Sequence, residues 1–402
     1  MNDLAIYLDN NATTQPLAEV TEAVHCAMNR FWGNPSSIHR IGQEARQQVD
    51  LAREAIAKLV GAKPASILFT SGGTEAANLA IQSACSVRSD RKCLVTSQIE
   101  HAAVGELMDR LQEDGMEVIR IRNDRDGVFC MDHLQEILES RAAEIAVVSL
   151  MWCNNETGVI EPIEEASELC IKHDVLLHSD GTQWVAKMPV DVGAVPVDLL
   201  SFAAHKFHGP KGVGALYVRP GLSITPLVTG GPQERGRRGG TENVPSILGF
   251  GVAAKKASLW LNAENISKME SLRDEFETKI ISKFPKVHIN SSGAKRAWTT
   301  SSISFPGVKG ELLLLMLSER GICASSGSAC SSGAFKNSKV IEAIGMPDDG
   351  LWGAIRFSFA RTTTALELDR TIDVLMEVFE TIKLLESSSV ASSCFLKVFQ
   401  LI

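Results

Sequence analysis

Residues 198–219, DLLSFAAHKFHGPKGVGALYVR, place two histidines and two lysines between two apolar runs. Lys206 follows the first run directly and stands next to His205. A short apolar run of this kind is typical of a buried strand. A lysine in such surroundings is costly unless it is paired or used chemically. The stretch therefore predicts a strand that ends at a chemically active position.

Short apolar runs also alternate with helical patterns on the N-terminal side of this stretch. The runs are SILFT (66–70), KCLVTS (92–97), EIAVVSLMW (144–152), VLLHSD (175–180) and VDLLSF (197–202). Strands that alternate with helices predict βαβ units and a mostly parallel sheet covered on both faces. The fold class is therefore α/β.

The pattern changes after a long helical stretch at 246–283. VHIN, TTSSISFPG and AIRFSFAR are short strand-like segments, with helical patterns at 310–320 and 365–385. This arrangement predicts a smaller α+β unit. We expect a large domain at 16–262, a small domain formed by 1–15 and 263–386, and a tail at 387–402.

Composition excludes several classes of function. The 402 residues carry a net charge of −8, so there is no basic surplus for nucleic acid or for a membrane surface. The most apolar run, ELLLLMLSERG, is too short to span a bilayer. The N-terminus lacks the pattern of a signal peptide. Nine cysteines, an odd number without paired spacing, suit a reducing compartment, which predicts a cytoplasmic protein.

Polar residues follow the predicted strands at the edge where α/β sheets bind ligands. They are Thr74, His101, Asn155, Asp180 and Lys206. Gly72 and Gly73 precede a helix that opens with Thr74, and such a start binds anions through its backbone amides. The same residues also fit a tight turn with a threonine N-cap. No Walker lysine follows, which argues against a nucleoside triphosphate.

The combination of Asp180, Lys206 and the glycine turn indicates a function more specifically than each feature alone. Taken singly, Asp180 fits a turn aspartate, His101 fits a structural histidine and Lys206 fits a surface lysine. In combination they suit pyridoxal 5′-phosphate. A lysine binds its aldehyde, an aspartate holds its ring nitrogen and a helix start takes its phosphate.

Two further motifs need interpretation. GFGVAA (249–254) matches a dinucleotide fingerprint in form, but no strand precedes it, so helix packing explains it better. GICASSGSACSSGAF (321–335) is rich in small residues and carries Cys323 and Cys330. Cys330 fits either an inert small residue or a nucleophile on a mobile loop, and we expect Cys323 to be structural. The spacing of the two is not that of a zinc site, and no metal is predicted.

The motifs YLDNNATT, GNPSSIHRIG, TSGGTEAAN, NNETG, SDGTQ, AHKFHGPKGVGALYVR, GGTENV, SSGSACSSG and IRFSFAR occur in one order over residues 7–364. In this the chain resembles the cysteine desulfurases of the NifS-like branch, which are fold-type I pyridoxal-phosphate enzymes of the class V aminotransferase group. The resemblance implies a seven-stranded sheet. It also implies conversion of L-cysteine to L-alanine, with sulfur passed to an enzyme persulfide for iron–sulfur or other sulfur-cofactor assembly.

The resemblance also implies a role for each matching residue. Lys206 would hold the cofactor aldehyde and move the substrate α-proton, and Cys330 would accept the sulfur. Asp180 would pair with the ring nitrogen, Gln183 with the phenolic oxygen, and His101 would stack on the ring as an acid–base. The implied phosphate ligands are Gly73, Thr74, His205 and, across a homodimer, Thr241. Arg356 would clamp the substrate carboxylate, with Asn155 beside substrate and cofactor.

Ala203 departs from the resemblance, because the family often has a phosphate-binding serine there. One missing hydrogen bond is worth about 1 kcal/mol, which predicts weaker cofactor retention. The implied partner is a sulfur acceptor such as an iron–sulfur scaffold protein. A selenocysteine lyase and a non-catalytic binding scaffold remain the alternative functions, and a plain aminotransferase has no use for Cys330.

Overall fold

The computed structural model describes residues 5–326, 338–345 and 352–387, and its largest element is a seven-stranded sheet. The strand order is β2-β8-β7-β6-β5-β3-β4. All neighbouring pairs are parallel except those of β8, which runs antiparallel to β2 and β7. The strands are β2 (Ile67–Thr70), β3 (Cys93–Ser97), β4 (Glu117–Ile121), β5 (Ile145–Met151), β6 (Leu176–Asp180), β7 (Leu199–Ala203) and β8 (Gly214–Val218).

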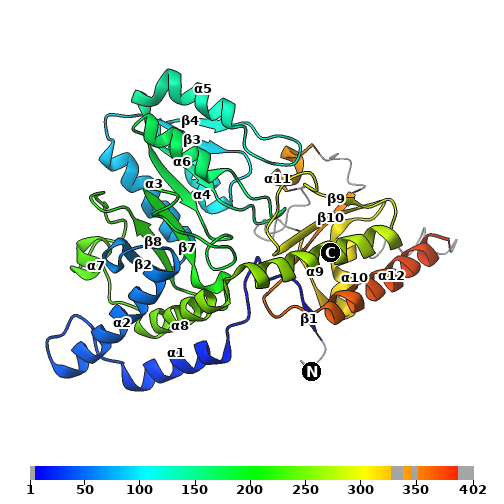
Figure 1. Cartoon of the computed structure of the whole chain (residues 1–402), viewed down its shortest axis with the longest axis horizontal. Coiled ribbons are helices and arrows are strands. Elements are labelled where there is room, and N and C mark those ends of the chain that lie inside the picture. The colour runs from blue at the N-terminus through cyan, green and yellow to red at the C-terminus, as the bar shows by residue number, and fades with distance from the viewer. Residues whose placement is uncertain (1–4, 327–337, 346–351, 388–402) are drawn as a thin grey trace.

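Helices cover both faces of this sheet, which explains its continuous apolar strands (Figure 1). Successive residues point to opposite faces, so Leu199 packs in one hydrophobic cluster and Leu200 in the other. One face is covered by α3 (Gly73–Val87) and α4 (Ala102–Glu113). The other is covered by α2 (Arg40–Leu59), α5 (Met131–Arg141), α6 (Ile163–Lys172) and α8 (Val244–Trp260), with α1 (Ala18–Arg30) against α8. The α/β fold predicted from the sequence is confirmed.

The smaller sheets lie on the right in Figure 1. A third hydrophobic cluster packs around them. The antiparallel sheet has the order β12-β10-β9, and β1 pairs in parallel with β11. These elements are β1 (Ile6–Tyr7), β9 (His288–Ile289), β10 (Thr300–Pro306), β11 (Ile322–Cys323), β12 (Trp352–Ser358), α9 (Ala263–Lys283), α10 (Gly310–Glu319) and α12 (Ala365–Ser387). The cluster joins Leu8 to residues beyond 263, and the proposed domain limits stay a prediction.

The long helical stretch expected at 246–283 is two helices, which corrects the sequence interpretation. Leu261 and Asn262 separate α8 from α9. Asn262 has extended backbone angles, and its side chain accepts a hydrogen bond from the amide of Asn265. Asparagine is a strong N-cap residue, so a new helix starts here. The pattern of helix-forming residues alone predicts one continuous helix.

The remaining helical elements are short. They are α7 (Gln233–Gly236), α11 (Lys339–Ala343), η1 (Pro64–Ser66), η2 (Ala142–Glu144) and η3 (Ala204–Lys206). No helix in the described ranges combines the length and the apolar character needed to cross a membrane.

Candidate active site

Lys206 and Asp180 lie at the same edge of the large sheet. Asp180 is the last residue of β6, and its partner in the neighbouring β7 is Ser201. η3 follows β7 directly and ends at Lys206. The register of the parallel strands therefore brings the two residues to one end, as the sequence predicted.

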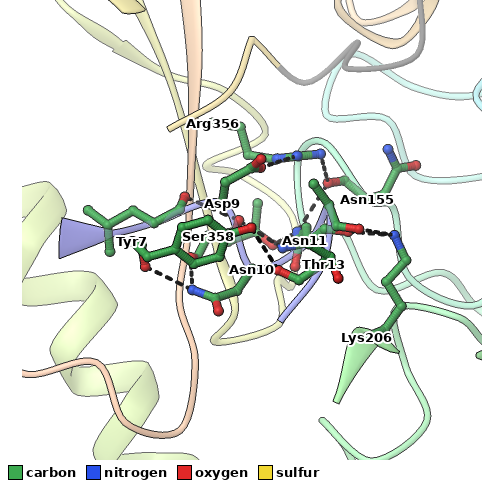
Figure 2. Close-up of polar contacts among 12 residues, drawn as sticks. Tyr7, Asp9, Asn10, Asn11, Thr13, Asn155, Lys206, Arg356 and Ser358 are labelled. Atoms are coloured by element: carbon green, nitrogen blue, oxygen red, sulfur yellow. Dashed lines mark hydrogen bonds and ion pairs between the residues drawn. The ribbon is translucent and has the colours of Figure 1, made fainter. Parts of the chain in front are cut away.

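The N-terminal segment 7–14 contacts Lys206, and the sequence did not assign this segment a role in the site (Figure 2). The Lys206 Nζ donates to the backbone oxygens of Asn11 at 2.8 Å and Ala12 at 2.9 Å. The Gln183 Nε2 donates to the same Asn11 oxygen at 2.9 Å. Asn11 is 2 % exposed, and its side-chain Nδ2 donates to the backbone oxygen of Asn155 at 3.1 Å. Asn11 is thus a shared acceptor at the centre of the predicted site.

Arg356 approaches the same segment from β12. It is 3 % exposed, and its Nη2 lies 2.8 Å from the carboxylate of Asp9. Its Nη1 donates to the backbone oxygen of Asn155 at 2.9 Å, as Figure 2 shows. The structure therefore brings together Arg356 and Asn155, the two predicted substrate-binding residues. Asp9 was not expected from the sequence, because the residues are 347 positions apart.

A pocket of about 420 Å³ opens at the start of α3. Gly73, the exposed Thr74 and His205 line it, together with Lys211 and Thr13. Backbone amides at a helix start and a lysine suit a phosphate group. The pocket thus unites three of the predicted phosphate ligands, and its residues fit the phosphate end of pyridoxal phosphate.

Burial favours the neutral forms of two histidines of the site. Burial, followed by the charges of Lys206 and Lys211, lowers the pKa of His205 to about 4. Burial also lowers the pKa of His101, against the opposite effect of Asp180. The His101 Nδ1 accepts the amide of Ala103 at 3.0 Å, so the proton of the neutral ring is on Nε2. His101 therefore offers an N–H donor, as well as a ring face, to a bound group.

Ala203 lies beside the glycine turn, where the missing hydroxyl was expected. It is 1 % exposed, and its Cβ would stand 3.6 Å from a Cβ added to Gly73. The Thr182 hydroxyl lies closer, 3.2 Å from that same position. Gly73 therefore faces one hydroxyl-bearing neighbour and one methyl group.

Neither Thr241 nor Cys323 lines the pocket at the start of α3. Thr241 is exposed and lines a cavity of about 190 Å³ with Glu234 and Arg238, and this cavity adjoins the pocket at the start of α3 through Ser71 and Gly212. Cys330 lies outside the described residues. Cys323 ends β11, where its carbonyl accepts the amide of Leu8 at 2.8 Å. In the described part of the chain, no group of three or more histidine, cysteine, aspartate or glutamate side chains could hold a metal ion.

Known proteins are similar to this chain in sequence along almost its whole length. The family model of aminotransferase class-V matches residues 6–371. The cysteine desulfurase of Trichormus azollae is 41% identical over 380 residues, which is 94% of each chain. The chain belongs to the class-V aminotransferase family, among its cysteine desulfurases. The cysteine desulfurase NifS of Azotobacter vinelandii is 42% identical over 368 residues, covering 91% of this chain and 90% of that relative.

Solved structures of the same family share the fold. A NifS-like protein superposes with a TM-score of 0.87 at 35% identity, covering 94% of this chain and all of its own. SspA in complex with cysteine superposes with a TM-score of 0.77 at 32% identity, covering 89% of this chain and 99% of that one. The family and fold expected from the motifs are therefore confirmed, and this family is generally pyridoxal-phosphate-dependent.

Proposed function

We propose that this cysteine desulfurase binds pyridoxal 5′-phosphate at Lys206 and converts L-cysteine to L-alanine. The observation that carries the proposal is that Asp180 ends β6 and Lys206 ends η3 after the neighbouring β7. His205, next to Lys206, lines the anion pocket, and Asn11 links Lys206 to Asn155 and Arg356. Gly73, Thr74 and His205 would hold the phosphate. Asp180 would hold the ring nitrogen, Gln183 the phenolic oxygen and His101 the ring face. The cofactor supplies an electron sink for the bonds to the substrate α-carbon.

The residues of the chain orient the substrate and move its protons. Arg356 presents a guanidinium fork that matches a carboxylate, and Asn155 fixes the position of that fork. Asp9 holds Nη2 at 2.8 Å, so the substrate carboxylate either shares Arg356 with Asp9 or displaces it. Lys206 accepts the α-proton of the substrate and can return a proton to the product.

Cys330 completes the reaction as the sulfur acceptor, in a segment outside the described residues. Its thiolate attacks the substrate sulfur, and the new S–S bond forms as the substrate C–S bond breaks. The bonding electrons remain with the carbon fragment, which takes up protons to become alanine. The products are L-alanine and a Cys330 persulfide, whose sulfane sulfur passes to an acceptor protein such as an iron–sulfur scaffold.

A homodimer would complete the phosphate site. Thr241 does not line the pocket at the start of α3 in its own chain, and a second copy would bring its Thr241 to that pocket. Met28, Trp32 and Ile38 are 64%, 69% and 96% exposed, and such apolar side chains suit a subunit contact. A molecular mass in solution equal to two chains would support the homodimer, and the mass of one chain would contradict it.

The described cysteines are free thiols, which fits the proposed cytoplasmic location.

The decisive test measures visible absorbance, alanine and sulfide on one preparation. The wild type, given L-cysteine, is expected to show the cofactor band and to release alanine. Lys206→Ala should lose the band and lower turnover by at least about 1000-fold. Cys330→Ser should keep the band but transfer no sulfur.

Cys323→Ala is the matched control for the cysteine variant, because it removes a thiol seven positions away. It should keep both the band and the turnover. Wild-type protein that binds the cofactor but makes no alanine would favour a binding scaffold. Faster turnover of selenocysteine than of cysteine would favour a lyase. Normal sulfide release by Cys330→Ser would overturn the role of Cys330.

A further inference from the structure

Lys187 is a buried lysine beside the site, and neither its spacing nor a motif drew attention to it. It is 4 % exposed and lies four residues after Gln183, in the turn that follows β6. Hydrogen bonds from Val185 to Gly181 at 2.8 Å and from Met188 to Trp184 at 3.0 Å fold this turn back on itself. Lys187 therefore points toward the N-terminal segment instead of solvent.

The Lys187 ammonium contacts two side-chain amides. Its Nζ lies 3.0 Å from the Asn11 Oδ1, and it also donates to the Gln183 Oε1. No carboxylate in the described ranges forms an ion pair with Lys187. A buried charge with only neutral partners is expensive, so a fold that keeps one has a use for its donors or its charge.

These contacts fix the orientation of the Gln183 amide. An ammonium only donates hydrogen bonds, so the Gln183 oxygen must face Lys187. The Gln183 nitrogen then faces the opposite way, where it donates to the Asn11 backbone oxygen at 2.9 Å. Lys206 donates to that same oxygen. Without Lys187, the two ends of the amide could exchange places.

The charge of Lys187 also acts on the site. Burial, followed by the positive charge of Lys206 and a smaller effect of Arg356, lowers the pKa of Lys187 to about 7. The Cys153 thiol is itself buried and has a pKa raised to about 12, so it stays neutral. Lys187 in turn lowers the pKa values of His205 and His208. The charges of Lys187 and Lys206 therefore influence each other through a water-poor region.

We infer that Lys187 is a positioning residue for the reaction at Lys206. It holds the Gln183 amide with its N–H groups toward the cofactor phenolic oxygen, and it anchors Asn11, the acceptor that Lys206 shares. In its protonated form, Lys187 also polarises the amide, which strengthens Gln183 as a donor. This inference rests on the proposed function, since it assigns Gln183 to the phenolic oxygen.

The test is a pH titration of the visible band of the cofactor-loaded enzyme, together with turnover. Lys187→Met removes donor and charge, whereas Lys187→Gln keeps a neutral N–H donor. Loss of a positive charge stabilises the protonated form of the lysine–cofactor linkage. The pH at the midpoint of the titration of the absorbance band should therefore rise by about one unit in both variants. Turnover should fall by about ten- to a hundredfold in Lys187→Met and less in Lys187→Gln.

Two controls separate positioning from stability. Lys187→Arg keeps charge and donors, so its midpoint should stay at the wild-type value. Trp298→Phe removes the buried hydrogen bond from Nε1 to the Lys187 backbone oxygen, 2.9 Å long, and touches neither amide. It should lower the melting temperature and leave the midpoint unchanged.

A wild-type midpoint in both Lys187→Met and Lys187→Gln would overturn the inference and leave Lys187 a structural residue. If Lys187→Met does not fold, Lys187→Gln decides the matter alone through its midpoint. A wild-type protein without a visible band would instead reject the proposed function. The two failures are therefore distinguishable on the same preparations.

Discussion

Two buried basic side chains of this protein, Arg53 and Lys187, are stabilised in opposite ways. Arg53 is 6 % exposed and forms a double hydrogen bond with Glu234, with both contacts at 2.7 Å. Its guanidinium also lies 4.5 Å from the centre of the Phe69 ring. Lys187 is as buried, but its partners are the amides of Asn11 and Gln183.

The difference separates a charge that holds the fold from charges that serve the site. The opposite charges of Arg53 and Glu234 cancel, so this pair has little electrostatic effect beyond the α7 segment that contains Glu234. That segment needs such an anchor, because Glu234 and Arg235 adopt left-handed backbone angles with φ of 47° and 60°. Lys187 forms no ion pair with a carboxylate of the described residues, and burial with the nearby charge of Lys206 lowers its pKa.

The largest expected effect comes from removing the buried ion pair of Arg53 and Glu234. Arg53→Ala leaves the Glu234 carboxylate buried without its partner, so the free energy of unfolding should fall by about 3–5 kcal/mol. Urea unfolding measures this loss. Arg141→Ala removes a solvent-exposed bridge to Glu117 and Glu144 and should cost far less. Equal losses in the two variants would show that the buried pair is no anchor.

The second prediction concerns a buried base with neutral partners, His178. Its ring lies between the hydroxyls of Ser149 at 2.8 Å and Ser201 at 3.0 Å, and burial lowers its pKa from 6.5 to about 4. The folded state thus favours neutral His178, and its stabilising contribution is complete above pH 6.5. It is lost as the pH falls toward 4, by on the order of 3 kcal/mol.

Unfolding free energies between pH 4 and pH 7 measure this dependence. His178→Gln should be less stable than the wild type at pH 7, because it loses a fitted ring between two hydroxyls. It should also lose less stability on acidification. An identical pH dependence in both proteins would assign the acid sensitivity to other groups, among them His205 and His208, whose pKa values are also lowered to about 4.

The smallest expected effect is on cofactor binding in the anion pocket at the start of α3. Ala203→Ser restores a hydroxyl beside Gly73, so it should tighten cofactor binding by about 1 kcal/mol, or roughly fivefold in the dissociation constant. Equilibrium dialysis of the cofactor measures the change. Ala204→Ser buries the same group one position later, against Gly209, and should not tighten binding. Weaker binding by Ala203→Ser would indicate that Thr182 already fills the space for the hydroxyl.

Local patterns were sufficient for the architecture and for the strand-end residues. Apolar runs such as residues 175–180 and 197–202 became central strands, because both faces of the sheet are covered. Asp180 and Lys206 could be located from the sequence because the carboxyl ends of parallel strands always meet at one edge. The break between α8 and α9 was missed, although Asn262 carried a usable N-cap signal.

The sequence by itself determined the α/β fold class, the family motifs and the candidates Lys206, Asp180 and Arg356. Only the tertiary structure decided which groups surround them. Gln183 meets Asn11 across 172 positions, and Arg356 meets Asp9 across 347. Such contacts leave no periodic or spacing signal, because they arise when separate elements pack together. For the same reason, the sequence could not show that Lys187 is buried, or that its partners are two amides.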